Sequence, residues 1–146
     1  MAEGFARAYG AEVLDVESAG LAPALSLAPL TYHVMLQKNI DLGDYYPKDL
    51  EQVGGGFDLI VNMSGHDFPP YGATQIEAWQ VRDPIGESEE VFRQVRDEIE
   101  QRVLELIQRL RSRKPPASEI RHPAGTPSTA KPVSGKVDTW RRPPRQ

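Results

Sequence analysis

The feature that most restricts the fold of this chain is a long amphipathic segment between Glu89 and Arg111. Apolar residues recur there at intervals of three and four, which places them on one stripe of an α-helix. Ser88 precedes the segment as an N-cap residue, and glutamates occupy the first turn, where the helix dipole favours negative charge. The stripe consists of Phe92, Val95, Ile99, Val103, Leu106 and Leu110. The segment therefore predicts a helix long enough to lie across a sheet.

Shorter helical and extended segments alternate along the rest of the chain. Helical spacing of apolar residues predicts helices over residues 1–9 and 29–38, and Asn39 can close the second helix in the left-handed conformation. Period-two alternation and short apolar runs predict strands over residues 12–18, 57–63 and 77–81. This alternation predicts an α/β fold with a parallel sheet.

Charge is distributed unevenly over the 146 residues, a length that suits one domain. Residues 1–111 carry 9 Lys/Arg and 19 Asp/Glu, a net charge of −10, whereas residues 112–146 carry 8 basic and 2 acidic side chains, a net charge of +6. The second stretch is rich in Pro, Ser and Thr and poor in apolar residues. We therefore expect a folded domain over residues 1–111 and a disordered basic tail over residues 112–146.

The sequence gives no sign of a membrane or a nucleic acid as partner. No stretch approaches the roughly 20 apolar residues of a membrane span, and the first ten residues lack the basic and apolar regions of a secretory signal. The tail is short, proline-rich and nearly without aromatic residues, which favours a solvated tail over a nucleic-acid-binding one. We expect a soluble cytoplasmic protein and leave its oligomeric state open.

Cysteine is absent from the chain. Its absence removes disulfides, thiolate metal sites and any cysteine nucleophile. The histidines are His33, His66 and His122, and their spacing is not that of a zinc motif. We therefore expect neither a metal nor a cofactor.

Four segments carry a family likeness when they are taken in order. They are MAEGFARAYG at the start, SAGLAP, FDLIVNMSG, and WQVRDPIGESEEVFRQVRDEIEQRV. Together they resemble the low-molecular-weight protein tyrosine phosphatases and the thioredoxin-coupled arsenate reductases, which share one fold. The likeness covers about residues 1–111. It implies a three-layer α/β fold with a four-stranded parallel sheet of the phosphotyrosine phosphatase I type.

The resemblance also implies a phosphate-binding loop of the form Cys-x5-Arg between the first strand and the first helix, followed by the phrase RSPMAEG. The sequence begins at the Met of this phrase. We therefore expect the first, central strand and the loop with its Cys and Arg to be missing, with a misassigned start codon as the simpler cause. Without that strand, residues 13–16 and 59–61 lose the neighbour between them, so we expect the chain to fold poorly, to pair these strands directly or to aggregate.

Asp83 is the one catalytic residue that the resemblance assigns within the chain. It lies in Arg82-Asp83-Pro84, just before the long helix, and the following proline restricts it to extended geometry. In the family this aspartate protonates the leaving phenolate and then acts as base on the attacking water. In the chain as it stands, Asp83 has no nucleophile to assist.

Other polar and aromatic residues receive structural interpretations. His66 is expected to be exposed in a loop, although it could line the mouth of the pocket, and Trp79 is expected in the core or at its rim. Tyr45 and Tyr46 are surface residues or pack near the site entrance. Ser64 is rejected as a replacement nucleophile because no His/Asp pair can be assigned to it.

Three functions stay open on the sequence. The first is a phosphomonoester hydrolase acting on a phosphotyrosine protein or a small aryl phosphate, inactive without its front end. The second is an arsenate reductase, which adds redox cysteines; relatives carry one in the loop where this chain has residues 62–65, and the absence of any cysteine counts against reduction. The third is a non-catalytic remnant or binding module that uses the long helix or the tail.

Overall fold

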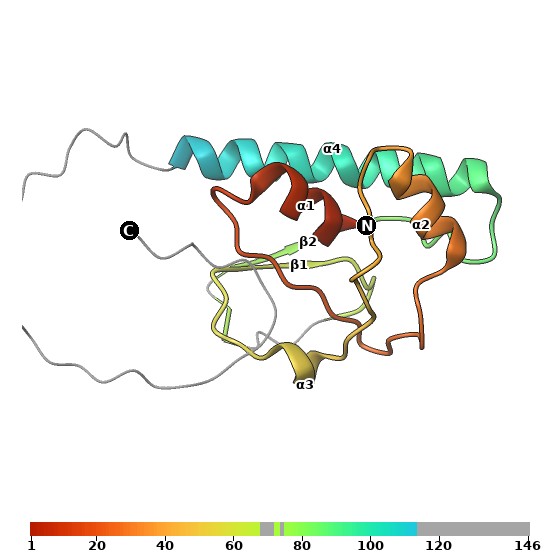
Figure 1. Cartoon of the computed structure of the whole chain (residues 1–146). Helices are drawn as coiled ribbons and strands as arrows, with labels where there is room; N and C mark the ends of the chain where they lie inside the picture. The colour runs from red at the N-terminus through yellow and green to blue at the C-terminus, as the bar shows by residue number, and fades with distance from the viewer. Residues whose placement is uncertain (68–71, 74, 114–146) are drawn as a thin grey trace, which may run out of the picture.

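The computed structural model describes residues 1–67, 72, 73 and 75–113. Figure 1 shows a small parallel sheet with longer helices on one side and a short helix on the other. The elements in chain order are α1 (Ala2–Gly10), α2 (Pro29–Leu36), α3 (Leu50–Val53), β1 (Leu59–Asn62), β2 (Gln75–Ala78) and α4 (Glu89–Arg113). The predicted α/β class and the parallel sheet are confirmed. The expectation of four strands is not, because β1 and β2 are the two strands found among the described residues.

The long amphipathic helix is confirmed as α4, which packs against both α1 and α2. It continues two residues past the expected end at Arg111. The last turn is held to the end of α1, because the Arg111 guanidinium pairs with Glu12 and donates to the Tyr9 carbonyl at 3.0 Å. Residues 112 and 113, expected to belong to the tail, are therefore part of α4, and the rest of the expected tail, residues 114–146, lies outside the described residues.

The strand predicted over residues 12–18 is wrong. The amides of Val13 and Leu14 donate to the Gly10 carbonyl at 2.9 and 2.8 Å, so turn-type hydrogen bonds following α1 occupy the first half of the segment. Asp15 alone in this segment takes part in β-pairing, as an isolated bridge residue. The apolar positions still point inward, since Leu14 and Val16 are buried.

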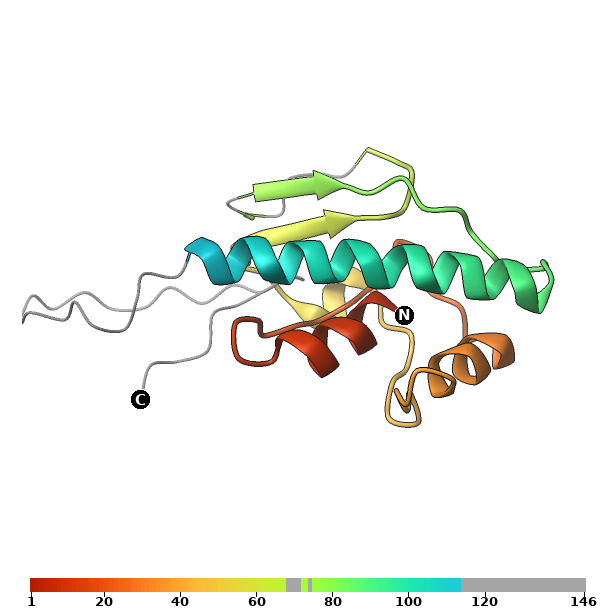
Figure 2. The same cartoon turned by 90° about the horizontal axis from the view of Figure 1, so that it is seen from above.

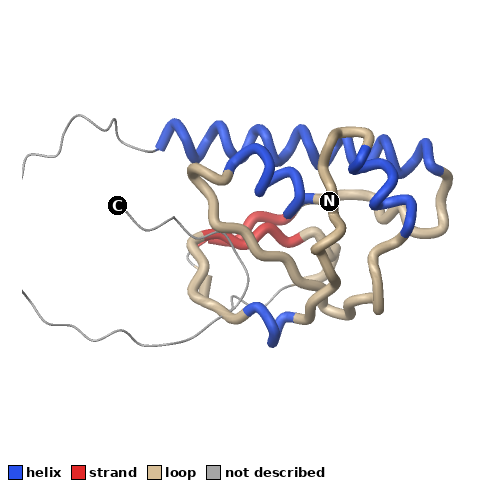
Figure 3. Tube along the Cα trace, viewed as in Figure 1, coloured by secondary structure: helices blue, strands red, loops and turns tan. Residues whose placement is uncertain are grey.

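The last strand also differs from its predicted position at residues 77–81. β2 covers Gln75–Ala78 and runs parallel to β1. The chain leaves the sheet at Trp79, whose amide makes the final bond, to the Asn62 carbonyl at 2.9 Å, and whose indole is buried in the core. Direct pairing of residues 13–16 with β1 is not seen in the described part of the chain. Figure 3 shows how much of the chain outside the helices is loop.

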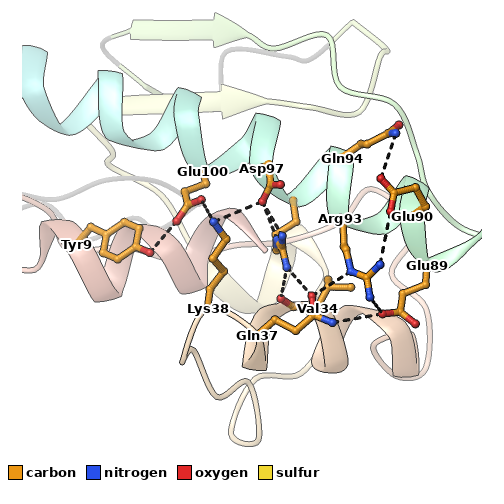
Figure 4. A network of polar contacts seen from close by, with 11 residues as sticks. Tyr9, Val34, Gln37, Lys38, Glu89, Glu90, Arg93, Gln94, Asp97 and Glu100 are labelled. Atoms are coloured by element: carbon orange, nitrogen blue, oxygen red, sulfur yellow. Dashed lines mark hydrogen bonds and ion pairs between the residues drawn. The ribbon is translucent and has the colours of Figure 1, made fainter.

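Polar contacts as well as apolar ones attach α2 to α4 (Figure 4). Asn39 ends the α2 region with φ of 58°, which confirms the predicted left-handed closure. The buried Arg96 of α4 donates to the Val34 carbonyl at 2.9 Å and to Gln37 Oε1 at 2.8 Å. Lys38 pairs with a glutamate of α4 at 2.7 Å. These contacts fix the helical layer that covers one face of the sheet.

Candidate functional site

The candidate site lies at the end of the molecule where the strands finish. Figure 2 shows that both strand arrows point to the end at which α1 begins. The segment that leads from β2 to α4, residues 79–88, runs at the same end. In open parallel sheets, ligands bind beyond the carboxyl ends of the strands, and helix N-termini there attract anions.

A buried carboxylate organises the first turn of α1. Glu3 is 9% exposed, and it accepts hydrogen bonds from Arg7 Nε at 2.9 Å and from the Ser18 hydroxyl. The Arg7 guanidinium also donates to the Val16 carbonyl at 2.5 Å. The cluster connects α1 to residues 16–18, which lie outside the helix. Sequence reasoning missed it, because the only local signal is the Glu3–Arg7 spacing of four residues.

Two cavities lie on either side of this cluster, and both are lined by Glu3 and residues 18–20. One, called here the tyrosine cavity, has a volume of about 210 Å³ and is bounded by Tyr45, Tyr46 and Lys48. Burial raises the pKa of the Tyr45 hydroxyl, and nearby Arg7 partly opposes this shift. The other, called the strand groove, has a volume of about 320 Å³ and lies between residues 16–21 and 60–64.

Asp83 is exposed in the segment between β2 and α4. Its Oδ1 accepts a hydrogen bond from the Ile85 amide at 3.0 Å, and Arg82 pairs with Glu87 at 2.5 Å across the same turn. Asp83 lines neither cavity. Its carboxylate thus holds its own turn, in the loop before α4 where the sequence predicted it, and its catalytic role stays a prediction.

The remaining residues singled out from the sequence lie where their structural interpretations put them. His66 is exposed, and its backbone amide donates to Ser64 Oγ at 3.2 Å. Ser64 donates to Asn62 Oδ1 at 2.7 Å, so its hydroxyl supports a loop. Trp79 is buried in the core. Tyr45 packs against that core, whereas 63% of Tyr46 is exposed.

Metal ligands do not converge in the described part of the chain: it holds no group of three His, Asp or Glu side chains that could bind one ion. No described helix combines the length and apolar character needed to cross a membrane. The expectations about cofactors and cellular location stay predictions.

The parallel α/β body, with its candidate residues beyond the strand ends, defines the class of protein. A family model described as low molecular weight phosphotyrosine protein phosphatase matches residues 1–115. The glutaredoxin arsenate reductase of Synechocystis sp. (strain ATCC 27184 / PCC 6803 / Kazusa) is 35% identical over 115 residues, which cover 75% of this chain and 87% of that protein. The chain belongs to the low-molecular-weight phosphotyrosine protein phosphatase family.

Solved structures agree with this assignment. An arsenate reductase in the reduced state matches with a TM-score of 0.65 and 35% identity, over 74% of this chain and 86% of that one. An arsenate reductase in the phosphate binding state matches with a TM-score of 0.67 and 34% identity, over 75% and 86% of the two chains. The family likeness read from the sequence is thereby confirmed, and the named relatives are arsenate reductases.

Proposed function

We propose that this chain is the oxyanion-handling body of an arsenate-reductase-type protein, and that its 146 residues do not turn over without a thiol from outside them. The observation that carries the proposal is the 35% identity, over most of both chains, to a protein named arsenate reductase. This identity supports the second of the three functions left open by the sequence, arsenate reduction, over phosphotyrosine hydrolysis.

Both chemistries need a thiolate. A phosphatase of this family uses one to attack phosphorus, and an arsenate reductase uses thiols as the electron source. The sequence contains no cysteine, so neither step can occur on the chain's own side chains. What the chain does offer is the start of α1, whose backbone amides and helix dipole favour an oxyanion.

Asp83 is proposed to be the proton-transfer group once a thiol is present. It lies on the segment that connects β2 to α4, at the end of the sheet where α1 begins. A protonated Asp83 would neutralise the oxygen that leaves arsenic or phosphorus. Its bond to the Ile85 amide would hold the carboxyl in position while it does so.

A two-stage assay tests this function. The 146-residue chain is expected to show neither arsenate reduction, with glutaredoxin or thioredoxin as reductant, nor aryl phosphate hydrolysis. A fusion that places an apolar strand and a Cys-x5-Arg loop before Met1 is then assayed for both reactions. We expect arsenate reduction to exceed hydrolysis, and Asp83→Asn to lower it by about 10²-fold or more, whereas Asp44→Asn leaves it unchanged. Turnover by the cysteine-free chain would refute the proposal.

A second candidate is a non-catalytic binding module, favoured by the absence of cysteine. The same fusion separates the two. Failure of a folded fusion to process either oxyanion supports the binding module. Reading the codons upstream of Met1 adds an independent check, because codons for an apolar strand and a Cys-x5-Arg loop support the enzyme.

A further inference from the structure

The tyrosine cavity has the lining of a site for proline-rich chains. The rings of Tyr45 and Tyr46 bound it, and 63% of Tyr46 is exposed although Lys48 lies over that ring at 5.5 Å. The Tyr46 ring therefore keeps surface for a further contact. Aromatic-lined grooves bind proline-rich segments, which enter in the preformed polyproline II conformation at a low cost in entropy. The rest of the lining includes Pro23, Leu27, Leu42 and Pro47.

The loop that carries the two tyrosines is acidic. Residues 41–51 contain four acidic side chains and one basic side chain, Lys48, which is paired with Glu17 at 2.6 Å. Asp41 and Asp44 are exposed just before the tyrosines, and Asp44 makes no hydrogen bond or ion pair with a described residue. The charge that the loop offers to a ligand is therefore negative. A complementary ligand combines proline rings with basic side chains.

The chain's own sequence contains segments of this composition. Residues 114–146 lie outside the described residues, and two Pro-Pro pairs occur among them, Pro115-Pro116 and Pro143-Pro144. The second pair has an arginine on each side in TWRRPPRQ, residues 139–146, called here the proline–arginine segment. Its guanidinium groups can stack on an exposed tyrosine ring and pair with a carboxylate. It therefore matches both the rings and the charge of the cavity.

Reach along the chain selects the second pair over the first. The cavity lies at the start of α1, where Glu3 lines it, whereas α4 runs past the opposite end of α1 (Figure 1). The nine residues of α1 span about 13 Å. Pro115 and Pro116 follow the last residue of α4, Arg113, so closely that they extend at most about 10 Å from it. Pro143-Pro144 begins 30 residues after Arg113 and reaches up to about 90 Å.

We propose that the tyrosine cavity binds the proline–arginine segment of the same chain, with its prolines against the tyrosine rings and its arginines beside Asp41 and Asp44. Because the segment is tethered to α4, it is present at a high effective concentration, and weak contacts suffice to hold it. The bound segment would lie beside residues 18–20, which line both cavities. This binding does not depend on the oxyanion chemistry proposed above.

The test uses the full chain, whose lack of cysteine allows one spin label to be placed at will. Gln146→Cys carries a nitroxide at the end of the segment, and backbone amide signals are compared by NMR with the label oxidised and reduced. We expect the signals of Asp44 and Tyr46 to lose most of their intensity when the label is oxidised. Those of Glu98 and Glu105, exposed on α4, should retain theirs.

Two tail variants separate this segment from the basic charge of the tail as a whole, because each reverses three charges. The variant within the segment should restore the Tyr46 signal, and the variant nearer α4 should leave it weakened. The first carries Arg141→Glu, Arg142→Glu and Arg145→Glu, and the second carries Lys114→Glu, Arg121→Glu and Lys131→Glu.

Further matched pairs test the prolines and the acidic loop. Pro143→Ala with Pro144→Ala should reduce the loss of signal at Tyr46 by about half or more, whereas Pro115→Ala with Pro116→Ala should not. In the body, Asp44→Asn should also reduce the loss at Tyr46, and Asp58→Asn, at an exposed position before β1, should not.

Three results would overturn the proposal. The first is an equal loss of signal at Tyr46 and at the two glutamates of α4, which would mean diffuse attraction of the tail to an acidic body. The second is a loss at Tyr46 that persists when the three arginines of the segment are reversed. The third comes from mixing a nitroxide-labelled chain with an isotope-labelled one: an equal loss there would make the tail of a second copy the occupant.

Discussion

The α2–α4 interface and the outer edge of β1 differ in how far their polar groups are hydrogen-bonded. At the interface, a buried arginine, Arg96, has carbonyl and carboxylate partners within 2.9 Å on two elements. At the edge, the backbone of Leu59 and Val61 has no described partner outside the β2 ladder. Close packing and complete hydrogen bonding make the helical layer the stable part of the molecule. The sheet edge is the part whose backbone groups have no partner among the described residues.

The largest expected effect on stability comes from removing a large buried side chain from the helical layer. Phe5 of α1 is fully buried and stacks on Tyr9 at 5.7 Å. Phe5→Ala should cost about 3–5 kcal/mol of unfolding free energy, because it removes apolar contacts and leaves a cavity. Ile76→Ala, on the exposed side of β2, should cost less than about 1 kcal/mol. Urea unfolding followed by circular dichroism measures both variants. Equal losses of unfolding free energy would contradict the contrast between the helical layer and the sheet.

The next effect concerns the buried arginine. Arg96→Met keeps the apolar stem but removes the side-chain donor to the Val34 carbonyl and one of the two arginine donors to Gln37 Oε1, at a cost of about 2 kcal/mol. Arg93 is a suitable control, since it also contacts Gln37 but its side chain is 40% exposed. Arg93→Met should cost less than about 1 kcal/mol. If the two variants unfold at the same urea concentration, the network in Figure 4 is not what attaches α2.

The same contrast explains which features could be predicted from the sequence. The α4 stripe and the closure at Asn39 follow from local spacing and backbone preference, so both were predictable. Arg96 was not, because a charged residue inside a helix is ordinarily solvated and its partners lie about 60 residues away. The strand expected over residues 12–18 failed because the Gly10 carbonyl captured two of its amides.

For the candidate site, the resemblance to a known family predicted more than the chemistry of individual residues did. The position of Asp83 in the loop before α4 followed from the order of the elements, and its catalytic role was assigned only by the resemblance. The Glu3–Ser18 contact could not be foreseen, because it depends on how residues 16–18 pass the first turn of α1. The strand groove likewise depends on tertiary arrangement, since its two walls, residues 16–21 and 60–64, come from distant parts of the sequence.

A smaller effect is expected on the other side of the sheet, where α3 is a single turn. Asp49 caps it: its Oδ1 accepts from the Gln52 amide at 3.1 Å, and Gln52 Oε1 accepts from the Asp49 amide at 2.9 Å. Asp49→Ala should cost about 1 kcal/mol, the usual worth of such a cap. Asp44→Ala, at an exposed loop position, provides the control in the same urea titration. A loss above that of Arg96→Met would contradict the ranking of the two layers.

The smallest effect tests how β2 is attached to α4, through pH. Arg109 donates to both carboxylate oxygens of Glu77 at 2.9 Å, and this hydrogen bonding lowers the pKa of Glu77 below its ordinary value of 4.5, against the opposing effect of burial. A carboxyl whose pKa is lower in the folded state stabilises the protein above the unfolded pKa, and this contribution is lost as the pH falls through the folded value. Glu77→Gln should therefore cost about 1 kcal/mol or less at pH 7, and this cost should shrink as the pH falls below 4.5.

The measurement is the unfolding free energy of both proteins at several pH values between about 3 and 7. Glu51→Gln, an exposed glutamate of α3, should show no such convergence with the unsubstituted chain. Salt sharpens the comparison, because Arg109 is 47% exposed and an exposed partner is screened by ions. The Glu77→Gln difference should thus shrink at about 1 M salt, whereas the Arg96→Met difference, which arises from buried groups, should not. If salt reduces the two free-energy differences equally, the contacts of α4 with the sheet and with α2 are equally exposed to screening. The distinction between the two regions would then be wrong.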